Sequence, residues 1–418
     1  MILTDETVVA TIKGVNYIKG KWHCNQCETT KQRHFYKYYT DVFKKTIVYC
    51  RKCIALGRMD NHNDIMITAT EHCKSDANYK LSFHLTPQQQ YASQRIVDAL
   101  LCHQSLLLYA VTGSGKTEMI FEAIHRARKD GLNVAVVSPR IDVVVELSLR
   151  IQTAFESEMI DVLYKGQRQL YNGHFVIATI HQLMRFKRHF DFVIIDEVDA
   201  FPLSMDNDLI SVVRAASTTQ CCTVYMTATP SNRFINQFPK DQIIKLPARF
   251  HQHILPIPTF KYYKIYPYKK QLYFLKLLKR QLALKRYTLV FFHQIDIMET
   301  MYHIYKQYIA GLTYVHSQDA LRLEKISELR KGKYNVIFTT TILERGFTMS
   351  HLDVIVIDSH KFKASALIQI AGRVGRKSDS PKGLVLYLHQ GISVSMLKAK
   401  SEIKQMNTLA RLRGWVND

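Results

Sequence analysis

The chain has 418 residues, of which 47% are hydrophobic, so it is long enough for two or three domains with buried cores. Its formal net charge of +22 favours a polyanionic partner, most simply nucleic acid, although ribosome-associated and lipid-facing proteins are also basic. No signal peptide, low-complexity tail or apolar run of membrane-spanning length is found, so we expect a soluble protein that inserts no segment into a membrane.

Residues 1–80 are expected to form a small module of short strands, rich in Tyr, Lys and Cys. Two Cys-x-x-Cys pairs, separated by 22 residues, supply four candidate zinc ligands: Cys24, Cys27, Cys50 and Cys53. Two such pairs close a tetrahedral site that has no open position and is therefore structural. The alternative is four reduced, buried cysteines. The spacer alternates aromatic and basic residues, as a β-hairpin would. His23, His72 and Cys73 are expected to be bystanders, and Cys102, Cys221 and Cys222 to lie in the core.

From residue 85 onward, apolar β-branched segments alternate with helical ones, which is typical of an α/β fold with parallel sheets. Strands are expected at 133–139, 175–179, 192–196 and 223–230, with helices at 86–102 and 117–130. Four prolines mark a candidate linker: Pro247, Pro256, Pro258 and Pro267. A second group of strands is expected at 287–292, 334–341, 354–359 and 383–388, with helices beginning at Tyr268, Ile297, Asp319, Ala364 and Val394. These patterns predict domains at 1–80, 81–245 and 246–418.

Residues 110–117, AVTGSGKT, fit a phosphate-binding loop between a strand and a helix, with Ala110 where the motif prefers glycine. Gly113 and Gly115 would let the backbone turn its N–H groups toward phosphates. Lys116 would reach the β- and γ-phosphates of ATP, and the Thr117 hydroxyl would hold Mg²⁺. The nucleotide contacts expected from this loop are Ala110, Val111, Thr112, Gly113, Ser114, Gly115, Lys116 and Thr117.

Two carboxylates, Asp196 and Glu197, end an apolar strand and should surface at the carboxyl edge of the sheet, where ligands bind. Asp196 would hold Mg²⁺, and Glu197 would orient and deprotonate the attacking water. An acidic strand end by itself is often a solvated turn. Following a phosphate-binding loop, it indicates a nucleotide hydrolase rather than a kinase.

Five segments occur in the order of the superfamily 2 helicase motifs: AVTGSGKT, DEVD (196–199), MTATP (226–230), TTTILERGFTM (339–349) and QIAGRVGR (369–376). The chain therefore resembles that superfamily. The resemblance implies an α/β fold of two RecA-like parallel-sheet lobes in tandem with ATP between them, here preceded by a small zinc-binding, β-rich N-terminal module. The box DEVD and the motif beginning at Gln369 depart from the RNA-unwinding DEAD-box branch, but neither departure removes a catalytic group.

The same resemblance implies roles for single residues. Arg373 and Arg376 would reach the γ-phosphate, where arginine spreads donors over transition-state charge, although an exposed basic helix start is the alternative. Gln89 would contact adenine, with Gln88 and Gln90 as alternative registers. The residues implied to couple hydrolysis to movement are Thr227, Thr229, Gly346 and Gln369. Hydroxyls that merely cap a strand end are the alternative for the two threonines.

Nucleic acid is the partner that the charge pattern favours. Residues 243–295 contain no Asp or Glu, and their Lys and Arg alternate with Tyr and Phe, a combination that suits a single strand. The same stretch also fits a linker and an amphipathic helix whose leucines pack on the second lobe, and we expect both, with lysines outward and these leucines inward: Leu272, Leu275, Leu278 and Leu282. By the helicase resemblance, the strand would run across both lobes and be contacted by Arg140, Thr179, Thr340 and Arg345. Backbone contacts of this kind carry little sequence preference.

A tetracysteine module placed directly before a compact superfamily 2 motor resembles the ComFA family of naturally transformable Gram-positive bacteria, which is related to PriA. This resemblance implies an ATPase that is stimulated by single-stranded DNA and drives DNA uptake during natural transformation. It also implies a cytoplasmic location at the inner face of the cell membrane, beside the uptake channel and other competence proteins. Two alternatives stay open: a PriA-like helicase of replication restart or repair, and a zinc nucleic-acid-binding protein with a non-catalytic motor.

Overall fold

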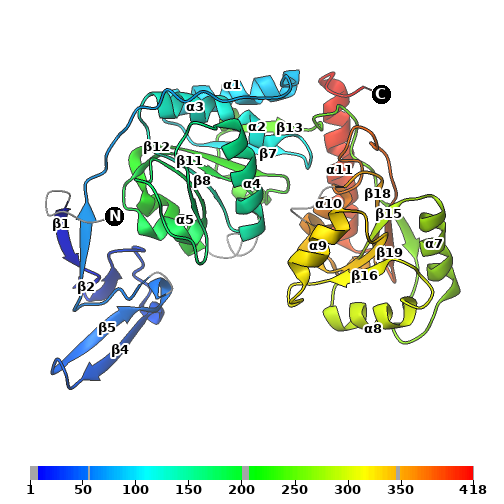
Figure 1. Ribbon diagram of the computed structural model, residues 1–418, viewed down its shortest axis with the longest axis horizontal. Helices are drawn as coiled ribbons and strands as arrows, with labels where there is room; N and C mark the ends of the chain where they lie inside the picture. Colours follow the sequence, from blue (N-terminus) through cyan, green and yellow to red (C-terminus); the bar gives the residue numbers. More distant parts are fainter. Residues whose placement is uncertain (1–7, 55–56, 200–206, 345–348, 418) are drawn as a thin grey trace. The chain divides into compact units, whose positions relative to one another are not determined.

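The computed structural model describes residues 8–54, 57–199, 207–344 and 349–417 (Figure 1). The chain divides into two compact units. The first comprises Met1–Leu85, Gln90–Leu108 and Thr117–Ile244, and the second comprises Thr86–Gln89, Tyr109–Lys116 and Lys245–Asp418. Each unit is therefore built from segments that are separated in the sequence, and the phosphate-binding loop belongs to the second.

The N-terminal module consists of three two-stranded antiparallel sheets. The pairs are β1 (Val8–Lys13) with β6 (Asp64–Thr68), β2 (Val15–Ile18) with β3 (Lys21–Cys24), and β4 (Phe35–Thr40) with β5 (Lys45–Cys50). The aromatic and basic spacer forms the β4–β5 hairpin, as its alternation predicted. Strand β3 ends at Cys24 in a turn over residues 25–27, and β5 ends at Cys50 before the 3₁₀ turn Arg51–Cys53, so each Cys-x-x-Cys pair lies where a strand ends in a turn.

A seven-stranded sheet follows. Its order is β13 (Ile243–Leu246), β7 (Leu106–Ala110), β12 (Ser217–Thr227), β11 (Phe190–Ile195), β8 (Val134–Ser138), β10 (Phe175–Thr179) and β9 (Asp161–Leu163). The pairs from β12 to β9 are parallel. Every residue of β8 and β10 is buried, as parallel strands covered on both faces must be.

Helices cover both faces of this sheet, and in Figure 1 α3 and α5 flank it from opposite sides. The helices here are α1 (Pro87–Leu101), α2 (Lys116–Met119), α3 (Phe121–Lys129), α4 (Ile141–Ala154), α5 (Asn207–Ala216) and α6 (Asn232–Ile235). Alternate strand residues such as Val137 and Val193 share one core cluster with Leu209 and Val212 of α5. The four cysteines of the module join this same cluster together with Val15 and Val48.

The second unit contains a six-stranded sheet in which all neighbouring strands are parallel. Its order is β14 (Thr259–Tyr262), β19 (Val385–His389), β18 (Leu352–Val356), β15 (Tyr287–Phe291), β17 (Val336–Thr339) and β16 (Leu312–Val315). Its helices are α7 (Leu272–Ala283), α8 (Ile295–Tyr305), α9 (Arg322–Arg330), α10 (Ala364–Ala371) and α11 (Val394–Leu412).

Strand alternation places a separate core on each face of this sheet. Leu289 and Phe291 of β15 face the cluster that includes residues of α10 and α11, whereas Val290 faces the cluster formed with α7 and α8. Figure 1 shows the same division, with α7 and α8 on one side of the strands and α10 and α11 on the other. Because successive side chains of a central strand point to opposite faces of the sheet, helices pack on both faces, and the unit has three layers.

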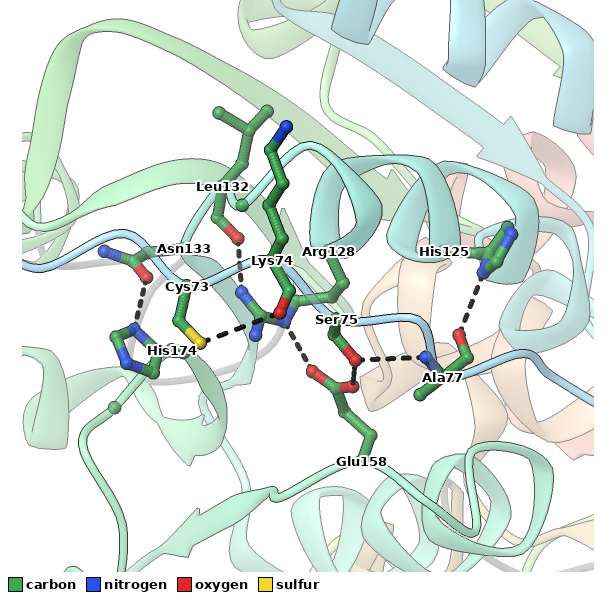
Figure 2. Close-up of polar contacts among 12 residues, drawn as sticks. Cys73, Lys74, Ser75, Ala77, His125, Arg128, Leu132, Asn133, Glu158 and His174 are labelled. Carbon is green, nitrogen blue, oxygen red and sulfur yellow. Dashed lines mark hydrogen bonds and ion pairs between the residues drawn. The ribbon is translucent and has the colours of Figure 1, made fainter.

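Residues 69–85 join the module to α1 without helix or strand, yet their polar groups are satisfied by the first unit (Figure 2). The Ser75 N–H donates to the Arg128 carbonyl at 3.0 Å, and the Ser75 hydroxyl donates to Glu158. Arg128 Nε lies 2.5 Å from Glu158 Oε1, with both side chains about 5% exposed or less. His125 Nδ1 lies 3.0 Å from the Ala77 carbonyl. The segment is therefore an ordered strap against α3, the helix that follows the phosphate loop.

Several expected element boundaries differ from the observed ones. Short edge strands such as β9 and β16, of three and four residues, were not predicted. So few residues are not enough to show the alternation of apolar and polar side chains that identifies a strand. The helix expected at 117–130 is interrupted at Ile120, where no Gly or Pro signals a break. Helix α7 begins at Leu272 rather than Tyr268, since the Gln271 side chain folds back to accept from the Tyr266 N–H at 2.9 Å.

Helices α8 and α9 also begin away from the predicted residues, two residues earlier and three later, whereas α10 and α11 begin at the predicted Ala364 and Val394. The Ser393 side chain accepts the Met396 N–H at 3.3 Å and so caps α11. Two side-chain expectations were wrong: Cys102 and Leu272 are exposed rather than in the core. Both lie at helix ends, where the apolar face no longer meets the sheet.

Candidate nucleotide site and tetracysteine cluster

The glycine-rich loop has the backbone that its glycines were expected to allow. Gly113 and Gly115 have φ of 80° and 75°, in the left-handed region that disfavours side chains. Ser114 between them is fully buried, and Lys116 Nζ donates to the Ala110 carbonyl at 3.4 Å. The lysine therefore bridges the two ends of the loop, with its ammonium beside the concave backbone that would face a phosphate.

Gln89 is the glutamine that contacts this loop. Its Nε2 donates to the Ser114 carbonyl at 3.1 Å, and its Oε1 accepts from the Thr86 N–H at 2.9 Å. Gln88 instead donates to the Ala248 carbonyl at 2.7 Å, and Gln90 is exposed. The geometry favours Gln89 over its two neighbours, while its contact with adenine stays a prediction.

Arg249, which lies inside the proline-marked linker, was not predicted from the sequence to be part of the site. Its guanidinium is fully buried and donates to the carbonyls of Gly375 and Gly372, the latter at 3.4 Å. The next residue, Phe250, donates its N–H to the Gly113 carbonyl at 3.0 Å. Burial, followed by the charge of Arg376, lowers the pKa of Arg249 to about 9, so it stays protonated at neutral pH. A lone arginine between prolines has no periodic or motif signal that could have identified it.

The two motif arginines lie on a tightly turned segment. Arg373 is buried and donates from Nε and Nη2 to the Glu344 carbonyl at 2.8 and 2.6 Å, while Arg376 Nε donates to the Gly372 carbonyl at 2.9 Å. A Cβ on Gly372 would lie 2.0 Å from Thr112 Oγ1 of the phosphate loop. Only glycine therefore allows the backbone at residue 372 to approach the loop within the second unit, where Arg376 Cγ would lie 3.8 Å from a Cβ on Gly113.

The predicted acidic pair lies at the carboxyl end of β11. Asp196 is buried and accepts the Glu197 N–H at 2.9 Å. Glu197 has a φ of 54°, an uncommon conformation for a residue with a side chain, and one that occurs often at functional sites. The strand end thus orients two adjacent carboxylates differently, which suits one metal-binding and one water-activating group.

The last residue of the DEVD box connects the acidic pair to the two motif threonines. Thr227 and Thr229 donate their hydroxyls to Asp199 Oδ1 and Oδ2, each at 2.5 Å. No role of its own was assigned to Asp199 from the sequence, since the DEVD box departs from DEAD-box relatives at Val198, so this contact was missed. Both threonines are buried, and their contact with Asp199 offers a physical route between the ends of β11 and β12.

The expected DNA contacts are only partly described. Arg140 precedes α4 and is held by Asp142, whose Oδ2 lies 2.9 Å from Nη2. Thr179 ends β10 and Thr340 follows β17, so both lie at carboxyl ends of parallel strands. Arg345 and Gly346 lie outside the described residues. DNA contact by all of these residues stays a prediction.

The four cysteines of the module form a compact, fully buried cluster. Their sulfur atoms all lie within 4.8 Å of one another, with Cys24 to Cys53 at 3.7 Å and Cys27 to Cys50 at 3.8 Å. A tetrahedral zinc site with Zn–S bonds of about 2.3 Å has sulfurs roughly 3.8 Å apart, so the donors fit such an ion. Hydrogen bonds among the four thiols lower the pKa of Cys24 and Cys50 and raise the pKa of Cys27 and Cys53, so the four groups share protons closely, and the fit to zinc rests on the distances between the sulfurs.

Comparison with known proteins identifies the family. A model of the competence protein ComFA N-terminal domain matches residues 2–67. The competence protein ComFA of Bacillus subtilis is 36% identical over 406 residues, which cover 94% of this chain and 87% of that protein. The ComFA protein of Streptococcus pneumoniae is 33% identical over 407 residues, which cover 94% and 92%. The chain belongs to the ComFA family.

This ComFA-family chain also matches helicase models over both of its sheets. The type III restriction enzyme res subunit model matches residues 82–232, and the helicase conserved C-terminal domain model matches residues 269–378. Yeast Dbp5 bound to RNA and ADP BeF3 superimposes with a TM-score of 0.56 at 16% identity, covering 77% of this chain and 91% of Dbp5. The predicted fold class, two RecA-like lobes with a β-rich tetracysteine module, is confirmed.

These matches establish a ComFA homologue with the ATPase and helicase domains of superfamily 2. Among the helices of the described residues, none combines the length and apolarity needed to span a membrane. The domain boundaries and the roles of single residues stay predictions.

Proposed function

We propose that this ComFA-family protein hydrolyses ATP while moving along single-stranded DNA, and so drives DNA uptake during natural transformation. The observation that carries the proposal is the retention of a full set of hydrolysing groups in a chain of this family. Lys116 follows a glycine loop with left-handed backbone, Asp196 and Glu197 follow one strand, and Arg373 and Arg376 flank the segment whose Gly372 backbone lies beside the loop. A motor domain that no longer hydrolysed ATP would not need all of these residues.

In this mechanism the loop amides and Lys116 would hold the β- and γ-phosphates, and Thr117 with Asp196 would hold Mg²⁺, which would supply positive charge to those phosphates. Glu197 accepts a proton from the attacking water, whose oxygen bonds to the γ-phosphorus as the bond to the β–γ bridging oxygen breaks. ADP and phosphate leave. Arg373 and Arg376 stabilise the transition-state charge, and Thr227 and Thr229 relay the change through Asp199.

Movement would follow if nucleotide binding and release alternately tighten the grip of the two lobes on the DNA backbone. Arg140, Thr179, Thr340 and Arg345 are the proposed contacts, with little sequence preference. We propose that the buried tetracysteine cluster holds one zinc ion as a structural site. The protein would act at the cytoplasmic face of the membrane, beside the uptake channel.

The ATPase rate of the purified protein, measured alone and with single-stranded DNA, duplex DNA or RNA, tests this function. We expect single-stranded DNA to raise the rate several-fold more than the other two polymers do. Equal rates with and without DNA would contradict a DNA motor. Separation of a forked duplex during hydrolysis would instead favour the PriA-like helicase alternative.

Replacing Glu197 with glutamine should preserve nucleotide binding and lower ATP turnover by roughly a hundredfold, since the shape remains and the proton acceptor is lost. The left-handed backbone at this position is unaffected because the side chains branch alike. Fluorescent nucleotide binding and phosphate release measure the two effects. Glu156→Gln is the matched control, since that carboxylate is 60% exposed and pairs with Lys80. Lost nucleotide binding in Glu197→Gln would make Glu197 a structural residue.

A further inference from the structure

One face of the β4–β5 hairpin carries a cluster of aromatic rings, here named the tyrosine face and defined by Tyr36, Tyr38, Tyr49 and Arg58. Tyr36 and Tyr49 are opposite each other across the hairpin, with ring centroids 5.6 Å apart, and Tyr38 lies 6.3 Å from Tyr49. The Arg58 guanidinium lies 5.2 Å from the Tyr38 ring and 5.6 Å from the Tyr49 ring. The rings and the guanidinium hold one another in place.

This face is only partly buried: Ile47 on the same side of the hairpin is fully buried, and Tyr38 and Tyr49 are half-buried. The Tyr36 side chain is 51% exposed, and Phe43, at the turn of the hairpin, is also 51% exposed. By contrast, Cys50 and Val48 of the same hairpin point to the tetracysteine side and are buried. The zinc-cluster side and Ile47 therefore account for the fold of the hairpin, and the exposed ring of Tyr36 is left unexplained by them.

The charge around the tyrosine face is positive. Residues 8–68 contain eleven Lys and Arg against four Asp and Glu. Asp60, the acid that pairs with Arg58 at 2.9 Å, has a fully buried side chain. Lys45 pairs with Thr40 and therefore points to the same side of the hairpin as the tyrosine face. Lys44 precedes it in the turn. An anionic ligand with flat, apolar groups matches this surface, because cations pair with phosphates and rings stack on bases.

We propose that the tyrosine face binds single-stranded nucleic acid, with a base stacked on Tyr36 and the phosphate backbone beside Lys45. This surface is separate from the strand-end contacts proposed for the motor, and gives the tetracysteine module a task of its own: to hold the strand that the motor pulls. The choice of single-stranded DNA as the physiological strand rests on the proposed function, whereas stacking and charge suit any unpaired strand.

A matched pair of tyrosines on one strand tests the proposal. Tyr36 and Tyr39 are both exposed, by 51% and 61%, but alternate to opposite faces of β4. In the full-length protein, Tyr36→Ser should weaken binding of fluorescein-labelled oligothymidine about tenfold, the loss expected for one stacked base. Tyr39→Ser should bind like the unaltered protein, and Tyr36→Phe should too, since it keeps the ring. Equal affinities for both serine variants, whether lowered or not, would overturn the proposal.

A matched pair of lysines tests the backbone contact. Lys45 lies on the tyrosine face, whereas Lys37 is on the other face with its ammonium 5.5 Å from the Trp22 ring. Lys45→Gln should reduce the slope of log affinity against log salt by about 0.7, as for one single-strand phosphate, and Lys37→Gln should leave it unchanged. An unchanged slope in Lys45→Gln would contradict a phosphate contact at this face. Equal metal content in all variants confirms that the module is folded.

ATPase assays separate this proposal from the motor function. In Tyr36→Ser, the maximal rate with single-stranded DNA should match the unaltered protein, while the DNA concentration for half-maximal stimulation rises about tenfold. If DNA stimulates hydrolysis with the same half-maximal concentration in every variant, the tyrosine face is not a binding site although the motor proposal stands. If the unaltered protein is not stimulated at all, the motor proposal fails and the oligothymidine measurement still decides the binding site.

Discussion

Lys116→Ala should lower ATP hydrolysis roughly a thousandfold, to near the background of the assay, because the phosphate-binding loop loses its only ammonium. In the structure this ammonium donates to the Ala110 carbonyl, so it is held across the loop and needs little movement to meet a phosphate. No other lysine or arginine occurs between Ala110 and Thr117 to replace it. The rate of phosphate release, with and without single-stranded DNA, measures the effect.

Binding of single-stranded DNA should survive in Lys116→Ala, because both proposed DNA surfaces use other residues. Lys129→Ala is the matched control: this lysine lies at the exposed end of α3, the helix after the loop, and should hydrolyse ATP normally. Near-normal turnover in Lys116→Ala would show that the loop is not the hydrolytic site. Loss of DNA binding together with hydrolysis would show instead that the loop contributes to the DNA surface.

The parts of the site that depend on local backbone conformation were predictable from sequence. Gly113 and Gly115 adopt the left-handed backbone that their spacing required, and the apolar run before Asp196 forms the buried strand that brings this carboxylate to the sheet edge. Such features depend on a few neighbouring residues, whose steric and hydrophobic preferences act over one turn or one strand.

Features that depend on distant segments were not predictable. The buried position of Arg249 depends on hydrogen bonds to the carbonyls of Gly372 and Gly375, which lie more than a hundred residues later in the sequence. Asp199 is recognisable as a partner of Thr227 and Thr229 only once β11 and β12 lie side by side. Likewise, three adjacent glutamines are equivalent in sequence, and the fold alone makes Gln89 the one that contacts Ser114.

The boundary predicted at residue 80 shows a related difficulty. The strands of the module end at Thr68, but the following strap is fastened to α3 through Ser75, Arg128 and Glu158. The strap contributes the two hydrogen bonds of Ser75, which are made to the buried ion pair of Arg128 and Glu158. The amino-acid composition changes gradually along the strap, whereas its hydrogen bonds attach it to the first unit. Composition alone therefore could not locate the domain boundary.

Cys24→Ala combined with Cys27→Ala should unfold the module, the largest structural effect we predict. The module is small, and within its described residues few apolar side chains besides the cysteines are fully buried, chiefly Val15, Ile47 and Val48. A structural zinc site contributes roughly 10–16 kcal/mol of apparent binding energy to folding, far more than such a core supplies. Two remaining cysteines cannot close a tetrahedral site, so we expect loss of metal and rapid proteolysis within residues 8–68.

The motor should respond unequally to this double substitution. The module shares a core cluster with one face of the seven-stranded sheet, so the melting temperature of the first unit should fall, whereas the second unit has its own two clusters and should melt as before. ATP binding should persist, and oligothymidine binding should weaken with the tyrosine face lost. Cys73→Ala with Cys102→Ala is the matched control, since both thiols are exposed and outside the cluster. A protease-resistant, metal-free module in Cys24→Ala with Cys27→Ala would show that the four thiols form an ordinary core rather than a zinc site.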